Sequence, residues 1–276
     1  MTDDKSEETS LVTMNQYLDK NYAYKIAAML DIPLTEVQDL NLLPRGWHFP
    51  LLGSTTPRHS LREDGFPGFG VPMPDVGLPR ILMTGRSVSY KNDIPFNSMI
   101  ECQSSVSSLE ERESNGNRRV FITLTHKLFL LDKHIPCLTE DQFFVMLSNQ
   151  EKTFPQGRLP SKAYSSKLTL TPDSTMLFQY SALGFNSHKI HIDRQYAKEV
   201  EKLPDLVVNG GLSILLIKQF LRNQLEITPK SFNSNHFLPL YCDRPLTISG
   251  QKKNNTWEVS LTDNNGFVAV VAKGVY

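Results

Sequence analysis

The sequence predicts an α+β fold made of two similar halves, in which each half is a curved antiparallel sheet around a helix. Strand-like segments occur in two series, before and after a polar stretch at residues 148–167. In the second series, residues 209–225 are apolar on almost every face over the first two turns, which predicts a helix buried by its sheet. A buried helix wrapped by a curved antiparallel sheet is the hot-dog arrangement. Two such units with paired sheet edges would form a double hot-dog.

The division of the chain follows from this pattern. We expect a disordered polar tail over 1–13, an N-terminal unit over 14–150, a linker over 151–167 and a C-terminal unit over 168–276. Residues 50–78, where the helix of the first unit would be expected, are too rich in proline and glycine to form one. We therefore expect the N-terminal unit to be degenerate.

The first half begins with apolar residues at helical spacing over 14–30, which predicts one amphipathic helix. Residues 43–80 are dense in proline and glycine and predict a long surface loop, and loops of this length are usually functional. Strand composition then marks residues 81–90, 98–109, 120–130 and 142–147, with a turn at 113–117.

The second half repeats the pattern, with a strand over 168–180 followed by the apolar helix 209–225. Three further strands, at 238–249, 257–262 and 267–276, are expected to form a final meander. The turn between the last two contains the Asn-Gly pair that is favoured in tight hairpins.

Bulk composition excludes several classes of protein. Lys plus Arg and Asp plus Glu both number 29, so the formal net charge is zero and no nucleic-acid footprint is expected. The 3 cysteines are too few for a disulfide framework and fit no zinc spacing, which favours a reducing compartment. No run of apolar residues approaches the length of a membrane helix. The first residues are acidic and lack arginine, unlike a mitochondrial transit peptide.

The most informative segment is residues 181–196, which place an amide, two imidazoles and a carboxylate close together. Shortly afterwards, the run 206–211 ends in two glycines that open the apolar helix. Imidazole titrates near neutrality and can move protons. The positive end of a helix can stabilise negative charge on an oxygen. Together these groups suit proton transfer next to a thioester carbonyl.

Residues 178–212 resemble the MaoC-like double hot-dog dehydratases. In the N-terminal half, residues 44–50 (PRGWHFP), 77–90 (GLPRILMTGRSVSY) and 138–147 (LTEDQFFVML) occur in the same order as in that family. Within the family, the chain looks most like the fungal mitochondrial 3-hydroxyacyl-thioester dehydratases of type 2 and the bacterial mesaconyl-C4-CoA hydratase-like proteins. The resemblance covers nearly the whole chain and implies the double hot-dog fold.

The resemblance also assigns roles to four residues. The site motif of related (R)-specific hydratases reads roughly SGDxNPxHxD, and its catalytic histidine falls on His191. Its aspartate falls on Asn186 and its asparagine on His188, so the chain departs from the family's Asp–His pair. We expect Asn186 to orient water or substrate and His188 to take over part of the proton transfer. The backbone N–H that stabilises the oxyanion falls on Gly210, and no metal or organic cofactor is implied.

Structural roles remain open for the same residues. His191 and His188 could be buried structural histidines, and a His-x-x-His pair could bind zinc, although no third ligand is obviously placed. Asn186 could cap a loop, and Gly210 could serve turn geometry alone. Asp193 is most simply explained as the cap of the helix that follows it.

The function implied by the resemblance is a (3R)-hydroxyacyl-thioester dehydratase that acts on acyl carrier protein substrates in mitochondrial type II fatty acid synthesis. One active site per chain is implied, with the degenerate unit free to hold a long acyl tail. The alternatives are a CoA-thioester hydratase of small or branched acyl groups and a non-catalytic acyl-thioester binding module. A thioesterase would need a carboxylate where the chain has Asn186.

The expected partners are an acyl carrier protein or a CoA thioester. Lys189, Arg194 and Lys198 are candidates for a basic patch that docks an acidic carrier protein. A homodimer is compatible with the sequence. Localisation to mitochondria rests on the family resemblance alone.

Overall fold

The computed structural model describes residues 11–114, 116–148 and 157–276 of the chain. Its ten strands form one sheet in the order β1-β3-β4-β5-β2-β7-β10-β9-β8-β6, and every neighbouring pair is antiparallel. The strands are β1 (Val12–Leu18), β2 (Arg80–Tyr90), β3 (Ser98–Ser114), β4 (Asn117–Leu130), β5 (Leu138–Leu147), β6 (Ser166–Leu170), β7 (Ser231–His236), β8 (Leu246–Lys253), β9 (Thr256–Thr262) and β10 (Val268–Val275). The helices are α1 (Asn21–Met29), α2 (Thr35–Gln38), α3 (Ser174–Leu183), α4 (Lys189–Ile192) and α5 (Gly210–Gln224), together with the short elements η1 (Phe49–Leu52), η2 (Arg58–Ser60) and η3 (Tyr196–Val200).

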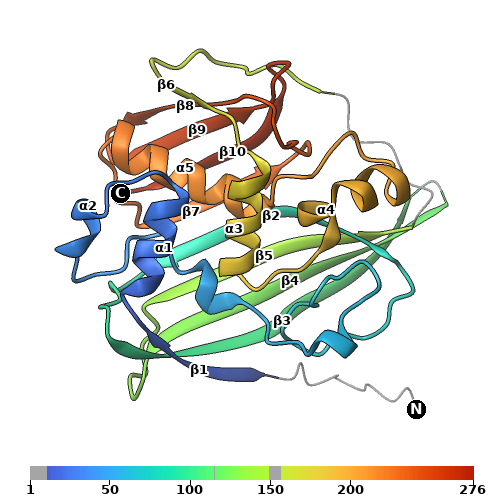
Figure 1. The fold of residues 1–276 in the computed structure, drawn as a ribbon, viewed down its shortest axis with the longest axis horizontal. Coiled ribbons are helices and arrows are strands. Elements are labelled where there is room, and N and C mark those ends of the chain that lie inside the picture. The colour runs from blue at the N-terminus through green and yellow to red at the C-terminus, as the bar shows by residue number, and fades with distance from the viewer. Residues whose placement is uncertain (1–10, 115, 149–156) are drawn as a thin grey trace.

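Strands β2 and β7 join the two halves of the sheet. Strands β1 to β5 come from the first half of the chain and β6 to β10 from the second, and the two sets meet where residues 85–89 pair with residues 231–235. Figure 1 shows α5 lying against the sheet near this junction, with α1 and α3 beside it. This is the double hot-dog arrangement that the sequence predicts.

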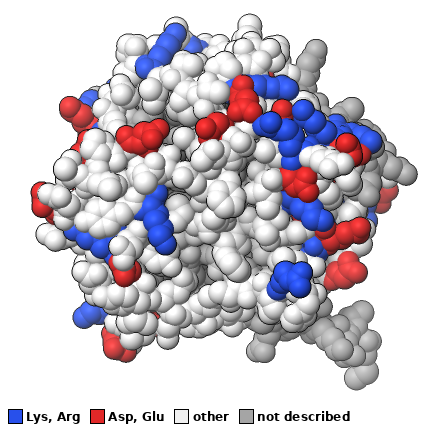
Figure 2. Space-filling view, in the orientation of Figure 1, with Lys and Arg blue, Asp and Glu red and all other residues white. Residues whose placement is uncertain are grey.

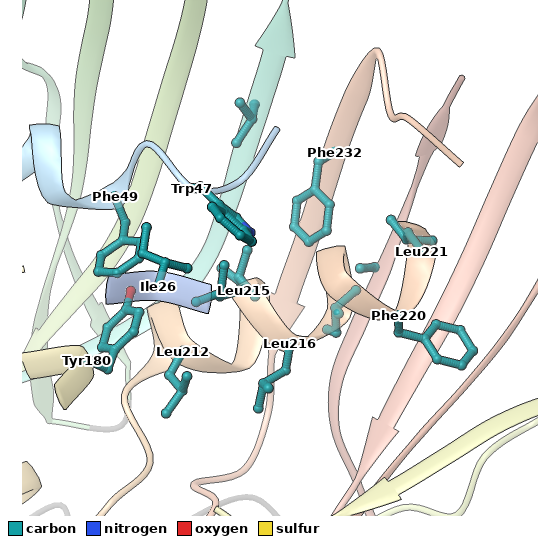
Figure 3. Close-up of a cluster of buried hydrophobic side chains, with 14 of the residues drawn as sticks. Ile26, Trp47, Phe49, Tyr180, Leu212, Leu215, Leu216, Phe220, Leu221 and Phe232 are labelled. Atoms are coloured by element: carbon teal, nitrogen blue, oxygen red, sulfur yellow. The ribbon is translucent and has the colours of Figure 1, made fainter. Parts of the chain in front are cut away.

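Helix α5 is the centre of the main hydrophobic core. Its buried residues are Gly211, Leu212, Ser213, Ile214, Leu215, Leu216, Ile217, Lys218, Phe220 and Leu221. Figure 3 shows side chains from several other parts of the chain around it, namely Ile26 of α1, Trp47 and Phe49 of the long loop, and Phe232 of β7. Burying each large apolar side chain contributes about 1.5–3 kcal/mol, so this helix fixes both halves of the molecule. Among the described residues, no helix is long and apolar enough to span a membrane.

Most of the predicted strands and the apolar helix are confirmed, and four segments differ. The strand predicted over 238–249 is irregular up to residue 245, a stretch that contains Pro239 and Pro245, and β8 begins only at Leu246. Strand β1 occupies the first part of the segment predicted as one amphipathic helix. It pairs with β3, and its side chains alternate between half-buried and exposed. Helix α3 replaces the later part of the strand predicted over 168–180. Its N-cap Asp173 accepts a hydrogen bond from the backbone N–H of Met176 at 2.8 Å. Strand β7 is absent from the prediction because its sequence, SFNSNH, is mostly polar.

The long loop predicted over 43–80 is confirmed, with η1 and η2 as its only regular pieces in the described chain. The start of this loop packs into the protein interior, because Trp47 and His48 are both only 2% exposed. The later part of the loop packs on the site segment, as described below.

The division into units 14–150 and 168–276 stays a prediction, and the strands of the two ranges lie on either side of the β2–β7 pair. The tail proposed over 1–13 lies outside the described residues up to residue 10, and its last two residues belong to β1. The linker proposed over 151–167 is described from residue 157 onwards, and its last two residues begin β6.

Candidate active site

A cavity of about 550 Å³ lies at the start of α5. Its lining includes Asn186, His188, His191 and Gly210, so the structure brings together the four residues that the sequence singled out. The long loop and the strands of the first half also contribute to the lining, through Phe66, Phe69, Ile81, Met83, Leu124 and Phe144. Both halves of the chain therefore build the same cavity.

His191 is held as a neutral imidazole with one free nitrogen. Its side chain belongs to α4, and the residue is 8% exposed. Nδ1 lies 2.7 Å from the backbone carbonyl oxygen of Val207. Because a carbonyl oxygen only accepts hydrogen bonds, Nδ1 carries the proton and Nε2 keeps its lone pair. Burial, followed by the neighbouring His188, lowers the pKa of His191 to about 3, so the ring is neutral at pH 7.

His188 is the nearest titratable neighbour of His191. The centroids of the two rings lie 5.5 Å apart, nearly perpendicular to each other. Nε2 of His188 lies 3.6 Å from Oδ2 of Asp64. Burial lowers the pKa of His188 to about 4, although the Asp64 carboxylate acts in the opposite direction. At neutral pH both imidazoles are therefore uncharged.

Asp64 was missed by the sequence reasoning, and it brings a carboxylate to this site from the long loop. Its Oδ2 pairs with Nη2 of Arg62 at 3.0 Å, and its backbone carbonyl accepts a hydrogen bond from the N–H of Lys189 at 2.8 Å. Next to it, Oγ of Ser187 donates to the carbonyl of Gly65 at 2.7 Å. The loop is thus fixed to the site segment by several hydrogen bonds. Nothing local in the sequence links these distant segments.

Asn186 caps a turn with one end of its amide. Its Oδ1 accepts a hydrogen bond from the backbone N–H of His188 at 3.1 Å, which is the Asx-turn geometry. The side chain also lines the cavity. This leaves the Nδ2 group as the part of the amide that can contact a substrate.

The start of α5 is open to the cavity. The first backbone N–H groups of a helix have no partner within the helix, and a side chain at the N-cap commonly satisfies one of them. Here the N-cap residue Asn209 makes no such bond. Its Oδ1 is buried without a hydrogen-bond partner among the described residues, and its Nδ2 donates to Oγ of Ser181 at 3.3 Å. The N–H groups at Gly210 and Gly211 are therefore left for a ligand. Together with the positive end of the helix dipole, such N–H groups can stabilise negative charge on an oxygen.

Space, rather than turn geometry, accounts for the two glycines. Neither Gly210 nor Gly211 has a backbone φ in the left-handed range. A Cβ atom on Gly210 would lie 3.0 Å from Sδ of Met83. A Cβ atom on Gly211 would overlap the hydroxyl oxygen of Tyr180 and lie 3.4 Å from Nη2 of Arg86. Side chains from both halves thus approach the backbone of the first turn closely.

A buried charge network, also missed by the sequence reasoning, stands behind the cavity wall. Nη1 of Arg86 lies 3.0 Å from Oε1 of Glu140, and Nε2 of His48 lies 2.8 Å from Oε2 of the same carboxylate. Burial alone would raise the pKa of Glu140, but Arg86 and His48 outweigh it and hold this pKa well below its usual range. The carboxylate is ionised and keeps the Arg86 guanidinium in place at the cavity wall.

Two further histidines line the cavity, His126 of β4 and His236 at the end of β7. Nδ1 of His126 lies 2.8 Å from Oγ of Ser104. Nε2 of His236 is buried and has no hydrogen-bond partner among the described residues. Burial lowers the pKa of His126 to about 4 and that of His236 to about 3. Strand alternation, which turns both side chains inward, is the signal that could have identified them.

Asp193 has the structural role expected of it. Its Oδ1 accepts a hydrogen bond from the backbone N–H of Tyr196 at 2.9 Å, at the start of η3. In the described parts of the chain, no group of three or more His, Cys, Asp or Glu side chains is arranged to hold a metal ion.

Comparison with known proteins identifies the family. The model of the family described as hydroxyacyl-thioester dehydratase type 2 matches residues 46–242, which include all four singled-out residues and every cavity-lining residue except Val270. The chain belongs to the hydroxyacyl-thioester dehydratase type 2 family. The resemblance drawn from the sequence is thereby confirmed.

Two relatives of this dehydratase match the chain along most of their length. The mesaconyl-C(4)-CoA hydratase of Chloroflexus aurantiacus is 24% identical over 255 residues, covering 91% of this chain and 89% of the relative. The mitochondrial hydroxyacyl-thioester dehydratase type 2 of Schizosaccharomyces pombe is 25% identical over 269 residues, covering 89% of this chain and 88% of the relative. Both names describe hydro-lyases that act on thioesters, and the chain is an enzyme of this type.

Solved structures support the fold independently. A MaoC-like dehydratase from Phytophthora capsici superposes with a TM-score of 0.73 at 14% identity, covering 100% of this chain and 98% of that one. A Mycobacterium tuberculosis protein described as having a double hotdog fold superposes with a TM-score of 0.60 at 9% identity, covering 97% and 96%. The double hot-dog prediction is confirmed by these likenesses.

Proposed function

We propose that this enzyme reversibly dehydrates (3R)-hydroxyacyl thioesters to trans-2-enoyl thioesters in the cavity at the start of α5. One observation carries the proposal. A neutral imidazole with an unprotonated Nε2, that of His191, lines the same cavity as the uncapped helix start at Gly210. A base and an oxyanion site on opposite sides of one substrate are what removal of an α-proton requires.

In the dehydration direction, Nε2 of His191 takes the α-proton, and the electron pair moves onto the thioester carbonyl oxygen. The N–H of Gly210 stabilises the resulting negative charge, and losing such a donor costs about 3 kcal/mol of barrier. The enolate then re-forms the carbonyl and expels the 3-hydroxyl group. The His191 imidazolium returns its proton to this hydroxyl, so that water leaves and the base is restored. Hydration follows the same steps in reverse.

Asn186 and His188 are proposed to assist at the 3-hydroxyl end of the substrate. The Nδ2 group of Asn186 can donate a hydrogen bond to the hydroxyl or to the water. His188 is neutral at pH 7 and can share the proton with His191, whose ring it contacts edge-on. Asp64 would act through His188 as a positioning residue, because it contacts that ring but does not line the cavity.

We propose an acyl carrier protein substrate of mitochondrial type II fatty acid synthesis. An aromatic wall supports a long acyl tail. Ring centroids of Phe66 and Phe69 lie 5.3 Å apart, and those of Phe69 and Phe144 lie 4.8 Å apart, which leads away from His188 over the sheet of the first half. The S. pombe relative is named as a mitochondrial dehydratase of hydroxyacyl thioesters, which agrees with this location. A fluorescent fusion of the full chain would test the location by its overlap with a mitochondrial marker.

A second candidate is hydration of small or branched CoA thioesters. It is favoured by the polar side chains of Arg86, His126 and Gln142, which come from adjacent strands and interrupt the apolar wall. A short or polar acyl group would suit these side chains better than a long hydrocarbon tail. The name of the C. aurantiacus relative agrees with this candidate.

The proposed docking residues for a carrier protein carry little unpaired charge. Arg194 pairs with Asp205 at 2.8 Å and Asp243 at 2.7 Å, and Lys198 lies 3.6 Å from Asp205. Nζ of Lys189 donates to a backbone carbonyl. Figure 2 shows basic and acidic side chains interspersed around one face of the molecule, whose centre carries few charges. A carrier protein would therefore meet a mixed surface.

The test is a hydration assay on the purified full chain with trans-2-enoyl-CoA thioesters of increasing length and with enoyl carrier-protein thioesters. We expect loss of the conjugated enoyl absorbance with wild type and a rate lower by 10²–10⁴-fold with His191→Ala. An exposed histidine variant, His134→Ala, serves as the control and should match wild type. Binding of the thioesters without turnover by wild type would reject the enzyme proposal and favour a binding module. The length profile decides between the two substrate classes.

A further inference from the structure

Tyr180 presents a hydroxyl group at the start of α5 that the proposed function does not yet use. The residue lies on α3, is 7% exposed and lines the cavity. A Cβ atom on Gly211 would overlap its hydroxyl oxygen, so this oxygen touches the backbone directly after Gly210. No described residue forms a hydrogen bond with the hydroxyl. The hydroxyl oxygen is not among the fully buried atoms, so it is accessible from the cavity and can donate to a ligand there.

The position of this hydroxyl is fixed from two sides. The Tyr180 ring stacks on Phe49, with centroids 4.4 Å apart and planes inclined by 17°. Figure 3 shows the pair beside the end of α5 that carries Leu212. Nη2 of Arg86 approaches the same point from β2, 3.4 Å from where a Gly211 Cβ would lie. The hydroxyl is therefore preorganised at the helix start, next to a buried cation.

The protonation state of the Tyr180 hydroxyl and the charge of the nearby Arg86 suit a hydrogen-bond donor at the start of α5. Burial raises the pKa of the Tyr180 hydroxyl well above neutrality, so the group keeps its proton under physiological conditions. A protonated phenol can donate a hydrogen bond to an oxygen that gains negative charge. Arg86, held by Glu140, adds positive charge on the same side.

We propose that Tyr180 is a catalytic residue that donates a hydrogen bond to the thioester carbonyl oxygen, beside the backbone N–H of Gly210. The oxyanion site then consists of a main-chain donor from α5 and a phenol from α3. This inference rests on the proposed hydratase function, because it names a second donor for the same developing charge. No proton is transferred from Tyr180, so the balance of the reaction is unchanged.

The test is removal of the hydroxyl alone. Tyr180→Phe keeps the ring that stacks on Phe49, so the fold and the cavity wall are retained. We expect kcat for enoyl-thioester hydration to fall about 10²–10³-fold, with KM changed by less than about threefold, because the bond strengthens as charge develops. The control is Tyr90→Phe, which removes a buried tyrosine hydroxyl that has no hydrogen-bond partner among the described residues and lies outside the cavity lining. We expect its kcat to stay within about twofold of wild type.

A spectroscopic measurement separates a donor from a merely structural residue. In the His191→Ala background, a trans-2-enoyl thioester should bind without turnover, and a hydrogen bond to its carbonyl should shift its ultraviolet absorption to longer wavelength. Adding Tyr180→Phe should reduce that shift, whereas adding Tyr90→Phe should preserve it. Equal kcat and equal shifts for Tyr180→Phe and Tyr90→Phe would overturn the inference while leaving the proposed function intact. Absence of turnover by wild type would instead reject the function on which it rests.

Discussion

At the scale of single residues, the site depends on how closely side chains approach the first turn of α5. Gly210 and Gly211 have no left-handed backbone conformation, and the atoms around them leave little room for a side chain at Gly210 and none at Gly211. The Met83 side chain lies close to the first glycine, and the Tyr180 and Arg86 side chains lie close to the second. Substrate oxygen and protein donors can therefore meet at the helix start without an intervening methyl group.

Gly211→Ala should destabilise the protein. In an unobstructed helix, replacing glycine by alanine stabilises by up to about 1 kcal/mol. Here the new Cβ would overlap the Tyr180 hydroxyl, and overpacking of this kind typically costs about 1–3 kcal/mol. We expect a lower midpoint in urea unfolding, together with reduced activity. Gly210→Ala should be milder, because its Cβ would meet the end of the flexible Met83 side chain at 3.0 Å. Equal stability of the two variants would contradict this account.

At the scale of elements, α3, α4 and α5 position the site together. Helix α3 carries Tyr180 and ends at the turn that holds Asn186, α4 carries His191, and α5 presents the N–H groups of its first turn. These elements hold one another through backbone bonds, such as the N–H of Val207 donating to the carbonyl of Ile190 at 2.9 Å. A substitution at the start of α3 should therefore alter the positions of the residues that line the cavity.

Asp173→Ala removes the N-cap of α3. Its Oδ1 accepts a hydrogen bond from the N–H of Met176 at 2.8 Å, and loss of such a cap typically costs about 1 kcal/mol. We expect a lower free energy of unfolding and a modest loss of hydration activity, since Tyr180 lies two turns along the helix. Asp173→Asn, which retains a capping oxygen, should keep most of both. Chemical denaturation measures the change in the free energy of unfolding, and the hydration assay measures the change in activity. A free energy of unfolding equal to that of wild type for Asp173→Ala would contradict the prediction.

The sequence predicts the elements that depend on local pattern and misses those that depend on distant contacts. Helix α5 is recognisable because it is apolar on nearly every face, and the long strands of the first half are recognisable by composition. The strand prediction over 168–180 is wrong for α3, since its apolar and aromatic residues fit either structure and only the Asp173 cap marks the start of a helix. Family resemblance brings His191 and Gly210 to attention. Asp64 and Arg86 reach the site only through the folded chain, so no local signal identifies them.

At the scale of the whole molecule, buried histidines couple stability to pH. Burial lowers the pKa of His126 and His188 to about 4 and that of His191 and His236 to about 3. The ordinary value in an unfolded chain is about 6.5. Below that value the unfolded chain binds more protons than the folded chain, so folding stability falls as pH falls. Above it, these groups are neutral in both states and contribute no pH dependence.

We therefore expect the contribution of these histidines to the free energy of unfolding to be nearly constant from pH 8 to 7. It should decrease steadily from about pH 6.5 to pH 4. Denaturant titrations at a series of pH values measure this slope. His126→Asn should make the slope shallower, because one depressed histidine is removed, whereas replacement of the exposed His134 by Asn should leave the slope unchanged. A stability that rises on acidification would contradict the assignment of neutral buried imidazoles.

The pairing of β2 with β7 has a consequence for how the enzyme behaves in solution. The cavity takes Phe144 and Arg86 from the first half and His191 and Gly210 from the second, and one continuous chain holds both halves. In an enzyme assembled from two separate hot-dog chains, the same walls would come apart on dilution. Here the tether keeps the effective concentration of one half around the other high at any protein concentration. Specific activity should therefore be the same at nanomolar and micromolar enzyme.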